Sequence, residues 1–392
     1  MQSVIIPVLK SKSGDVTDAN NYRAIAVSTA ISKIFESIIA NHYMNVSSSD
    51  MYQYGFKSGQ STGLCTRVLK RTTNYYTARG SHVFLCFVDF SKAFDKVNYS
   101  KLFNMLLDDG IAVEMVKLLA FWYSRQEMCV KWNSDISECF TIANGTRQGG
   151  VLSPYLFSRY IRGMLYCIAN SHTGCMIGNM PLNILVYADD IVLLSPSWRE
   201  LQSLIDSLLL CAESLHMSCN NSKTVCMILN PQNCSRIVQT SFSLLRLGKS
   251  DIQYVSSFRY LGHIISDRLC DNDDIQREIK NTFIRTKTLI RTFNRCSFDV
   301  KCALFRSYCL SLYDVALWQN CTLTCINKFR SCYDKCIKSL FGYSQRYSLT
   351  QVLLDTGLPS FDTVMHNSTC LFARSWQNCT NSLIEYLRAL RI

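Results

Sequence analysis

Two adjacent aspartates between apolar runs constrain the fold of this chain more than any other feature. Tyr187-Ala188-Asp189-Asp190 lies between Ile184-Leu185-Val186 and Ile191-Val192-Leu193-Leu194. The apolar runs predict two short buried strands, and the polar tetrapeptide predicts the turn that joins them. Because an uncompensated charge is costly to bury, the carboxylates indicate a cation site, with an ordinary acidic turn as the alternative. Mg²⁺ suits such a site, since it binds carboxylates and keeps positions for phosphate oxygens.

A second acidic strand end completes the pattern. The β-favouring run from His82 to Val88 ends on Asp89, which Phe90 follows. One carboxylate from this strand and two from the hairpin can hold two cations roughly 3.5–4 Å apart, an arrangement that stabilises the attacking and leaving oxygens of an in-line phosphoryl displacement. Asp95 lies well beyond the strand end and is interpreted as a helix or loop contact.

Seven segments in order resemble the motifs of reverse transcriptases from non-LTR (LINE-type) retrotransposons. A lone Tyr-Ala-Asp-Asp is a weak signal, whereas the ordered series is a strong one. The segments are two fingers motifs (21–26 and 54–62), the first catalytic-aspartate motif (87–97), the template and nucleotide-positioning loop (145–154), the catalytic hairpin (187–190), the palm lysine motif (220–224) and the primer grip (258–262). Ala24 and Ala26 depart from the family, which usually has proline and serine there, but neither change removes a catalytic group.

The resemblance implies an α+β fold, that of a right-hand polymerase with fingers, a palm built on an antiparallel sheet and a helical thumb. We expect the fingers at residues 1–80, the palm at 81–265 with a fingers-like insertion at about 126–144, the thumb at 270–345 and a C-terminal helical connection of unclear role at 346–392. Periodicity independently predicts an amphipathic helix from Trp198 to Leu215 and another over residues 275–293.

The resemblance also assigns roles to individual residues. Asp89, Asp189 and Asp190, with the backbone carbonyl of Phe90, would hold two Mg²⁺ ions, for which Mn²⁺ is a possible substitute. The other expected site residues are Arg23 at the triphosphate, Gln148 and Gly149 at the nucleotide, Phe94 beside the ribose, and Lys223, which either protonates pyrophosphate or is a surface lysine. Glycine is expected at 149 because a Cβ would intrude there. Lys10 is a weaker phosphate candidate, and Phe94 could instead be a core aromatic.

The charge of the chain fits a polyanionic partner. The formal net charge is +12, and residues 274–346 contain 13 Lys or Arg against 5 Asp or Glu. Basic side chains alternate with apolar ones over 275–295, which indicates a thumb helix that grips phosphates, or else an ordinary solvated basic face. The expected partners are an RNA template, a DNA primer and dNTPs. The sequence indicates no oligomeric state.

Other features concern location and cysteine chemistry. No apolar run reaches the roughly 18 residues that span a bilayer, and the N-terminus lacks a signal-peptide pattern, so we expect an intracellular protein, cytoplasmic or nuclear, without a membrane partner. The 20 cysteines are interpreted as reduced core thiols. Cys321-X3-Cys325 and Cys332-X3-Cys336 suggest zinc, but spacing of four within an apolar helix favours buried thiols.

The function expected from these features is RNA-directed DNA polymerase activity. The alternatives are a decayed retroelement copy that only binds RNA, and a polymerase resembling group II intron maturases or telomerase. Because family members carry an endonuclease before the polymerase and this chain begins within the fingers, we expect an N-terminally truncated form: a fragment, a truncated copy or a trimmed reading of a longer protein.

Overall fold

The structure is a computed structural model that describes residues 2–10, 14–43, 51–232 and 241–390. The chain divides into two compact units. The first comprises Met1–Ser58, Phe84–Cys226 and Gln239–Gln253, and the second comprises Gly59–Val83, Met227–Val238 and Tyr254–Ile392. The predicted boundaries of fingers, palm and thumb stay predictions, and each unit is described by itself.

The central sheet has the strand order β14-β11-β3-β10-β9. Its strands are β3 (Val83–Val88), β9 (Ile184–Tyr187), β10 (Asp190–Ser195), β11 (Val225–Leu229) and β14 (Gln253–Tyr254). β10 pairs antiparallel with both β9 and β3. All six residues of β3 are buried, as the continuous apolar run predicts. The predicted strand at 82–88 and the predicted hairpin at 184–194 are therefore confirmed.

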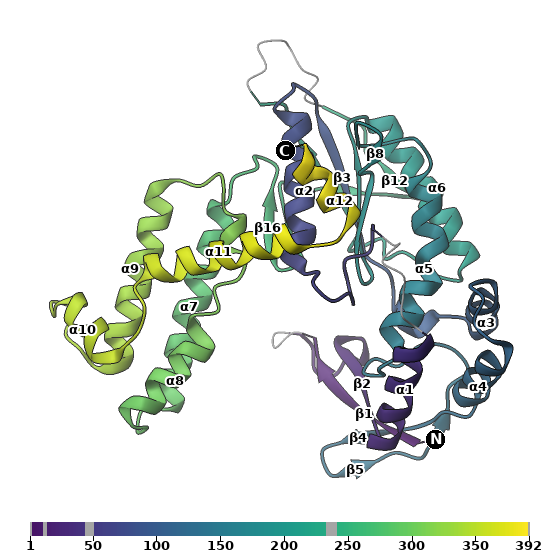
Figure 1. Ribbon diagram of the computed structural model, residues 1–392, viewed down its shortest axis with the longest axis horizontal. Helices are drawn as coiled ribbons and strands as arrows, with labels where there is room; N and C mark the ends of the chain where they lie inside the picture. Colours follow the sequence, from purple (N-terminus) through teal and green to yellow (C-terminus); the bar gives the residue numbers. More distant parts are fainter. Residues whose placement is uncertain (1, 11–13, 44–50, 233–240, 391–392) are drawn as a thin grey trace. The chain divides into compact units, whose positions relative to one another are not determined.

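Two helices of the first unit pack with these strands. α5 (Ser153–Ala169) contacts β9, and α6 (Trp198–Ser214) contacts β10 and α5 (Figure 1). The predicted amphipathic helix at 198–215 is confirmed as α6. Its buried face consists of Leu201, Leu204, Ile205, Leu208 and Ala212.

A second sheet joins the N-terminal strands to a segment more than 100 residues later. β1 (Gln2–Leu9) pairs antiparallel with β2 (Tyr22–Ser28) and parallel with β4 (Glu127–Trp132). The short strands β5 (Asp135–Ile136) and β6 (Phe140–Thr141) also pair with β4. The segment expected as a fingers-like insertion therefore shares a sheet with β1 and β2.

The first unit also contains helices and short strands outside these two sheets. They are α1 (Ala30–Tyr43), α3 (Tyr99–Asp108), α4 (Val113–Ser124), the 3-10 helices η1 (Ala19–Asn21) and η2 (Phe94–Lys96), and the short strands β7 (Met176–Ile177), β8 (Met180–Pro181), β12 (Arg246–Leu247) and β13 (Ser250–Asp251).

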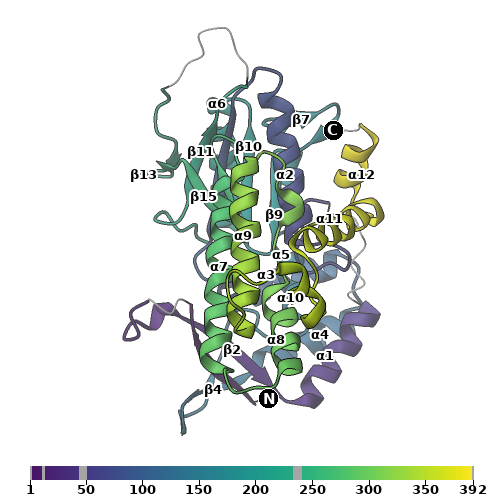
Figure 2. The same cartoon turned by 90° about the vertical axis from the view of Figure 1, so that its left-hand side faces the viewer.

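The second unit is mostly helical. α7 (Asn272–Thr292), α8 (Phe298–Cys309) and α9 (Leu323–Phe341) contact one another (Figure 2) around a core that includes Phe305, Phe329 and Tyr333. The predicted helix over 275–293 is confirmed as α7. The unit also contains α2 (Thr62–Thr77), β15 (Ser257–Tyr260), β16 (His263–Ser266), the 3-10 helix η3 (Val315–Leu317), α10 (Leu349–Thr356), α11 (Phe361–Asn378) and α12 (Ser382–Ala389).

A buried charge network holds the start of α7 in this unit. Lys70 on α2 forms an ion pair with Asp271, and its ammonium also donates to the carbonyl of Leu317 at 2.7 Å. His263 lies 3.1 Å from Asp274, which also accepts a hydrogen bond from the Trp318 indole at 2.8 Å. Because these charges lack solvent, their mutual pairing offsets the cost of burying them.

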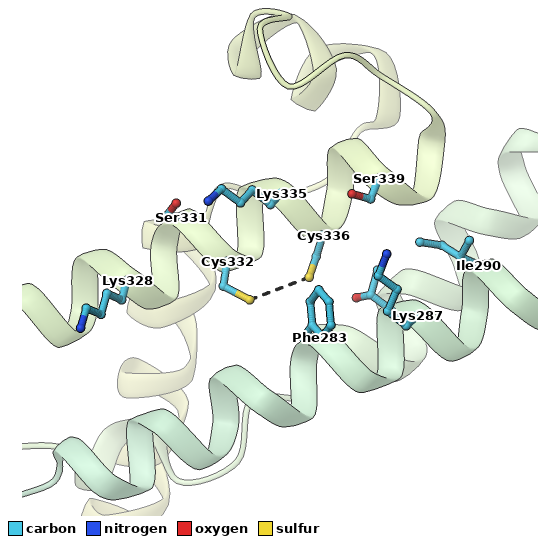
Figure 3. Close-up of a pocket in the computed structure, with 10 residues that line it drawn as sticks. Phe283, Lys287, Ile290, Lys328, Ser331, Cys332, Lys335, Cys336 and Ser339 are labelled. Carbon is cyan, nitrogen blue, oxygen red and sulfur yellow. Dashed lines mark hydrogen bonds between the residues drawn. The ribbon is translucent and has the colours of Figure 1, made fainter.

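The four cysteines of the two predicted pairs, at 321 and 325 and at 332 and 336, are buried or half-buried thiols. Cys332 and Cys336 lie on successive turns of α9 and face α7, with 4.0 Å between their sulfur atoms (Figure 3). Cys325 is also buried on α9, whereas Cys321 precedes this helix. Within the described ranges, no helix is both long and apolar enough to cross a membrane.

Candidate polymerase site

The hairpin register places three carboxylates at one end of the central sheet. Tyr187 pairs with Asp190, so Ala188 and Asp189 form the tip of the β9–β10 turn. Val88 pairs with Ile191, and Asp89 therefore emerges from β3 next to Asp190 on the neighbouring strand. The structure thus brings together the three aspartates that the sequence singled out.

These carboxylates carry more negative charge than their surroundings neutralise. Burial raises the pKa of Asp189, and the charge of Asp89 raises it further. Burial and the neighbouring Asp189 and Asp89 raise the pKa of Asp190 to about 6. In the described part of the chain, no three His, Cys, Asp or Glu side chains stand close enough to hold a metal ion together. The donor set is hard and anionic and so fits a divalent cation, but the carboxylates have not converged as ligands.

A buried glutamine clamps the tip of the hairpin. Gln53 is fully buried, and its Oε1 accepts hydrogen bonds from the Ala188 amide at 2.8 Å and the Gly55 amide at 2.9 Å. Its Nε2 donates to the Ala188 carbonyl at 3.0 Å. Ala188 has a φ of 59°, which is unfavourable for a residue with a Cβ, so the clamp stabilises a strained turn. Sequence reasoning missed Gln53, although it immediately precedes the motif at 54–62.

The Tyr54-Gly55 step brings this motif against the same turn. The Tyr54 amide donates to the Val186 carbonyl at 2.8 Å. A Cβ at position 55 would lie 2.5 Å from the amide nitrogen of Ala188. Glycine is therefore required for the close approach of the two backbones.

The segment at 218–224 surrounds the exit of β3. The Asn220 amide donates to the Asp89 carbonyl at 2.7 Å, and Phe90 forms an antiparallel bridge with Cys219. The Lys223 ammonium lies 3.9 Å from an Asp89 carboxylate oxygen, and its side chain is 62% exposed. Lys223 is thus placed beside the site rather than on a remote surface.

The loop at 145–152 is attached along both of its edges. The Gly145 amide donates to the Val97 carbonyl at 2.8 Å, and the Ala26 amide donates to the Gln148 carbonyl at 2.7 Å. Gly149 has a φ of 113°, and a Cβ there would lie 2.5 Å from the Ala26 carbonyl oxygen. Glycine is needed at 149, and the structure supplies the reason: the atom that a Cβ would meet is backbone of β2.

A buried ion pair anchors the same loop to α1. Arg147 forms an ion pair with Glu36, and the two side chains are 2% and 1% exposed. Arg147 also donates to the hydroxyls of Ser3 and Ser28, each at 3.0 Å. The second oxygen of Glu36 accepts from the Val151 amide at 2.7 Å. Sequence reasoning missed both partners, because nothing local to either residue indicates the other.

The remaining predicted residues lie along these elements. Arg23 is exposed on β2, and its charge counteracts the rise in the pKa of Asp189. Phe94 on η2 is half-buried and stacks on Phe157, with ring centroids 4.2 Å apart. The Lys10 ammonium donates to the Asn20 carbonyl at 2.7 Å, which ties it to the β1–β2 connection.

Comparison with known proteins decides the family. The model of the family described as reverse transcriptase (RNA-dependent DNA polymerase) matches residues 9–265. The chain belongs to the reverse transcriptase family. Family membership and the antiparallel pairing of β10 with β3 and β9 in the central sheet confirm the predicted α+β fold of a right-hand polymerase.

The curated relatives of this reverse transcriptase are proteins of non-LTR retrotransposons, which confirms the resemblance drawn from the motifs. A 115 kDa protein in the type-1 retrotransposable element R1DM of Drosophila melanogaster is 24% identical over 67% of this chain and 24% of that protein. The Pol polyprotein from the type-2 retrotransposable element R2DM of the same species is 24% identical over 62% of this chain and 23% of that protein. The chain thus spans about a quarter of the length of these relatives.

Solved structures of telomerase are similar to this reverse transcriptase at low identity. Apo telomerase from Candida tropicalis has a TM-score of 0.48 at 11% identity, covering 98% of this chain and 63% of that one. Telomerase from Candida albicans, solved with a fragment of telomeric RNA, has a TM-score of 0.47 at 10% identity, covering 92% of this chain and 65% of that one.

Proposed function

We propose that this chain is an RNA-directed DNA polymerase of a non-LTR retrotransposon, which extends a primer 3′-hydroxyl with dNTPs on an RNA template by two-metal phosphoryl transfer. The observation that carries the proposal is the gathering of Asp89, Asp189 and Asp190 at one sheet end. Burial, and after it the negative charge of neighbouring aspartates, raises the pKa of Asp189 and Asp190. Such a cluster in a reverse transcriptase is best explained by divalent cations that bind during turnover.

The cation-binding group consists of the three aspartates and the Phe90 carbonyl. Mg²⁺ is the expected ion, with two ions bound and Mn²⁺ as a possible substitute. When bound, the ions activate the attacking hydroxyl and stabilise the leaving phosphate oxygen. The protein itself would contribute hard oxygen ligands, and Gln53 holds the turn that carries two of the aspartates. A fixed tip limits how far the ligands must reorganise, which favours ordered binding.

The neighbouring side chains would position the nucleotide. Arg23 would bind the triphosphate, because a guanidinium matches two phosphate oxygens at once. Gln148 and Gly149 would border the nucleotide, on a loop whose backbone is fixed by Ala26. Lys223, beside Asp89, would hold a proton for the departing pyrophosphate. The half-buried ring of Phe94 would border the ribose.

The second unit would bind the nucleic acid through α7. Arg277 and Arg285 on this helix form ion pairs with Asp274 and Glu278. These carboxylates already neutralise much of the positive charge of the two arginines. The exposed cations of the segment are Lys280, Lys287, Arg291 and Arg295. These four, rather than the whole basic run, would contact phosphates.

Primer extension on poly(rA)/oligo(dT) tests the proposal. The wild-type chain should extend the primer with Mg²⁺ and dTTP, and Asp189→Asn should remove most of this activity while RNA binding persists. Asp206→Asn is the matched control, since Asp206 is an exposed carboxylate on α6 that hydrogen-bonds Gln202. Mn²⁺ binding, followed by electron paramagnetic resonance, should weaken only in the Asp189 variant.

Two outcomes of these experiments would contradict the proposed polymerase. Tight RNA binding without extension by the wild-type chain would favour the decayed, RNA-binding alternative. Near-normal extension by Asp189→Asn would refute the assignment of the catalytic hairpin.

A further inference from the structure

A basic cavity in the second unit has no acidic residue in its lining. It lies between α2, η3, α11 and α12 and has a volume of about 420 Å³. α12 contacts α2 (Figure 1), η3 also contacts α2, and α11 contacts η3. Its lining residues are Arg67, Arg71, Ala316, Thr369, Phe372, Ala373, Trp376, Gln377 and Arg388. Three guanidinium groups therefore share one concave site that no carboxylate lines. Outside the lining, the Glu385 carboxylate lies 3.8 Å from the Arg388 guanidinium and partly neutralises it.

Two of these arginines already donate hydrogen bonds to backbone carbonyls of the second unit. Arg67 donates to the Ala316 carbonyl at 3.1 Å, and Arg388 donates to the carbonyls of Trp376 and Cys379 at 3.2 and 3.0 Å. Carbonyl oxygens hold a guanidinium in place but leave its positive charge uncancelled. Both arginines are thus held in place, and the charge of Arg67 remains available to an anion, whereas Glu385 partly neutralises Arg388.

Arg71 is the group that remains available. Its guanidinium lies 5.4 Å from the centroid of the Trp376 ring and, among the residues that the structure describes, forms no hydrogen bond or ion pair. Arg67 lies 5.8 Å from the same ring, so the indole orients both cations. Burial lowers the pKa of both arginines, and the charge of Arg71 adds to this effect at Arg67. The two like charges oppose each other until an anion binds.

We infer that this cavity binds a backbone phosphate of single-stranded nucleic acid, through Arg71 with support from the charge of Arg67. Guanidinium groups match phosphate oxygens in a planar, two-point geometry. The half-buried ring of Phe372 adds an aromatic surface at the cavity wall, a common companion of phosphate contacts in single-strand binding. The choice of nucleic acid over other phosphates rests on the proposed function, whereas the anion site itself does not.

Salt-dependent RNA binding tests the inference with the full chain. Fluorescence anisotropy of a labelled single-stranded RNA, measured from low to physiological salt, gives the slope of log K against log salt. Arg71→Gln should weaken binding several-fold and reduce the slope by about 0.7, the value for one lost phosphate contact on a single strand. Arg79→Gln is the matched control, because Arg79 follows the same helix, lies over the Tyr75 ring and is outside the cavity.

Competition distinguishes the sources of phosphate. Inorganic phosphate should displace RNA more weakly than an unlabelled RNA does, and this preference should shrink in Arg71→Gln. Equal effects of Arg71→Gln and Arg79→Gln would overturn the inference. Tighter binding of inorganic phosphate or of a phosphoserine peptide than of RNA, lost in Arg71→Gln, would overturn the nucleic-acid assignment. Since binding requires no turnover, a chain inactive in primer extension still gives a result here.

Discussion

Arg147 and Glu36 form a buried ion pair that joins the loop at 145–152 to α1 and the start of α5. The pair is almost inaccessible to solvent, and Glu36 also accepts hydrogen bonds from the amides of Val151 and Leu152. The carboxylate therefore neutralises the guanidinium and satisfies two backbone donors. Removing its charge would leave Arg147 as an uncompensated buried cation, while the loop would lose its anchor.

We expect Glu36→Gln to lower the free energy of unfolding by about 3–5 kcal/mol, because a broken buried pair leaves one charge without a partner. Urea denaturation followed by circular dichroism measures the change. Asp251→Asn is the control, since Asp251 pairs with Arg246 at 3.5 Å with both side chains more than half exposed. That variant should change stability by no more than about 1 kcal/mol. Equal losses in the two variants would contradict the structural role of Glu36.

Gly149→Ala should disturb the loop at 145–152, which we propose borders the nucleotide. The new Cβ would meet the Ala26 carbonyl, and the φ of 113° is a glycine conformation. Strain of about 1–3 kcal/mol would shift the loop, so the proposed enzyme should show a higher KM for dNTPs. Gly163→Ala is the control, because Gly163 lies within α5 with nothing near its Cβ position. That change should be neutral or stabilising by up to about 1 kcal/mol. An unchanged KM in Gly149→Ala would argue against this loop as a nucleotide contact.

Local patterns were sufficient to predict several elements of the site. Alternation and continuous apolar runs correctly predicted β3, the β9–β10 hairpin and α6, because burial of each element depends mainly on its own residues. The three aspartates could be placed together for the same reason. The carboxylates lie at or beside strand ends, and the antiparallel pairing of β10 with β3 and β9 brings those ends together.

Long-range partners could not be predicted. The parallel pairing of β1 with β4, the Gln53 clamp and the Arg147–Glu36 pair each join segments more than 100 residues apart. A polar residue in a sequence does not indicate which distant partner satisfies it once it is buried. The basic run of α7 shows the same difficulty, because buried Asp274 and Glu278 neutralise arginines that the charge pattern counts as exposed.

The raised pKa of Asp190 predicts that the ionised carboxylate lowers the stability of the folded chain, although the proposed polymerase activity requires it. In the folded, metal-free chain this pKa is about 6, against about 3.9 for an unfolded aspartate. Between these values the folded state binds more protons, so this group lowers stability as pH rises from about 4 to about 6. Asp190→Asn should therefore raise the Tm above pH 6 in EDTA and abolish primer extension.

Thermal melts with and without Mg²⁺ provide the control. Mg²⁺ should raise the Tm of the wild-type chain by neutralising the carboxylates, and should do so less in Asp190→Asn. Asp206→Asn should respond as wild type does, since its carboxylate lies elsewhere on α6. A lower Tm for Asp190→Asn above pH 6 in EDTA would show that its charge is compensated in the folded chain.

Phe94→Val should weaken the discrimination against ribonucleotides. The Phe94 ring stacks on buried Phe157 and lies 6.1 Å from the Phe56 ring in a T-shaped arrangement. The side chain remains partly exposed, so a surface is left to border a ribose. A 2′-hydroxyl would clash with the ring, and valine would remove that clash. We expect a higher ratio of rNTP to dNTP incorporation with a modest loss of dNTP use. Phe103→Val, a half-buried phenylalanine on α3, should leave the ratio unchanged. If Phe94→Val lowers stability and the use of both sugars equally, the ring serves the core.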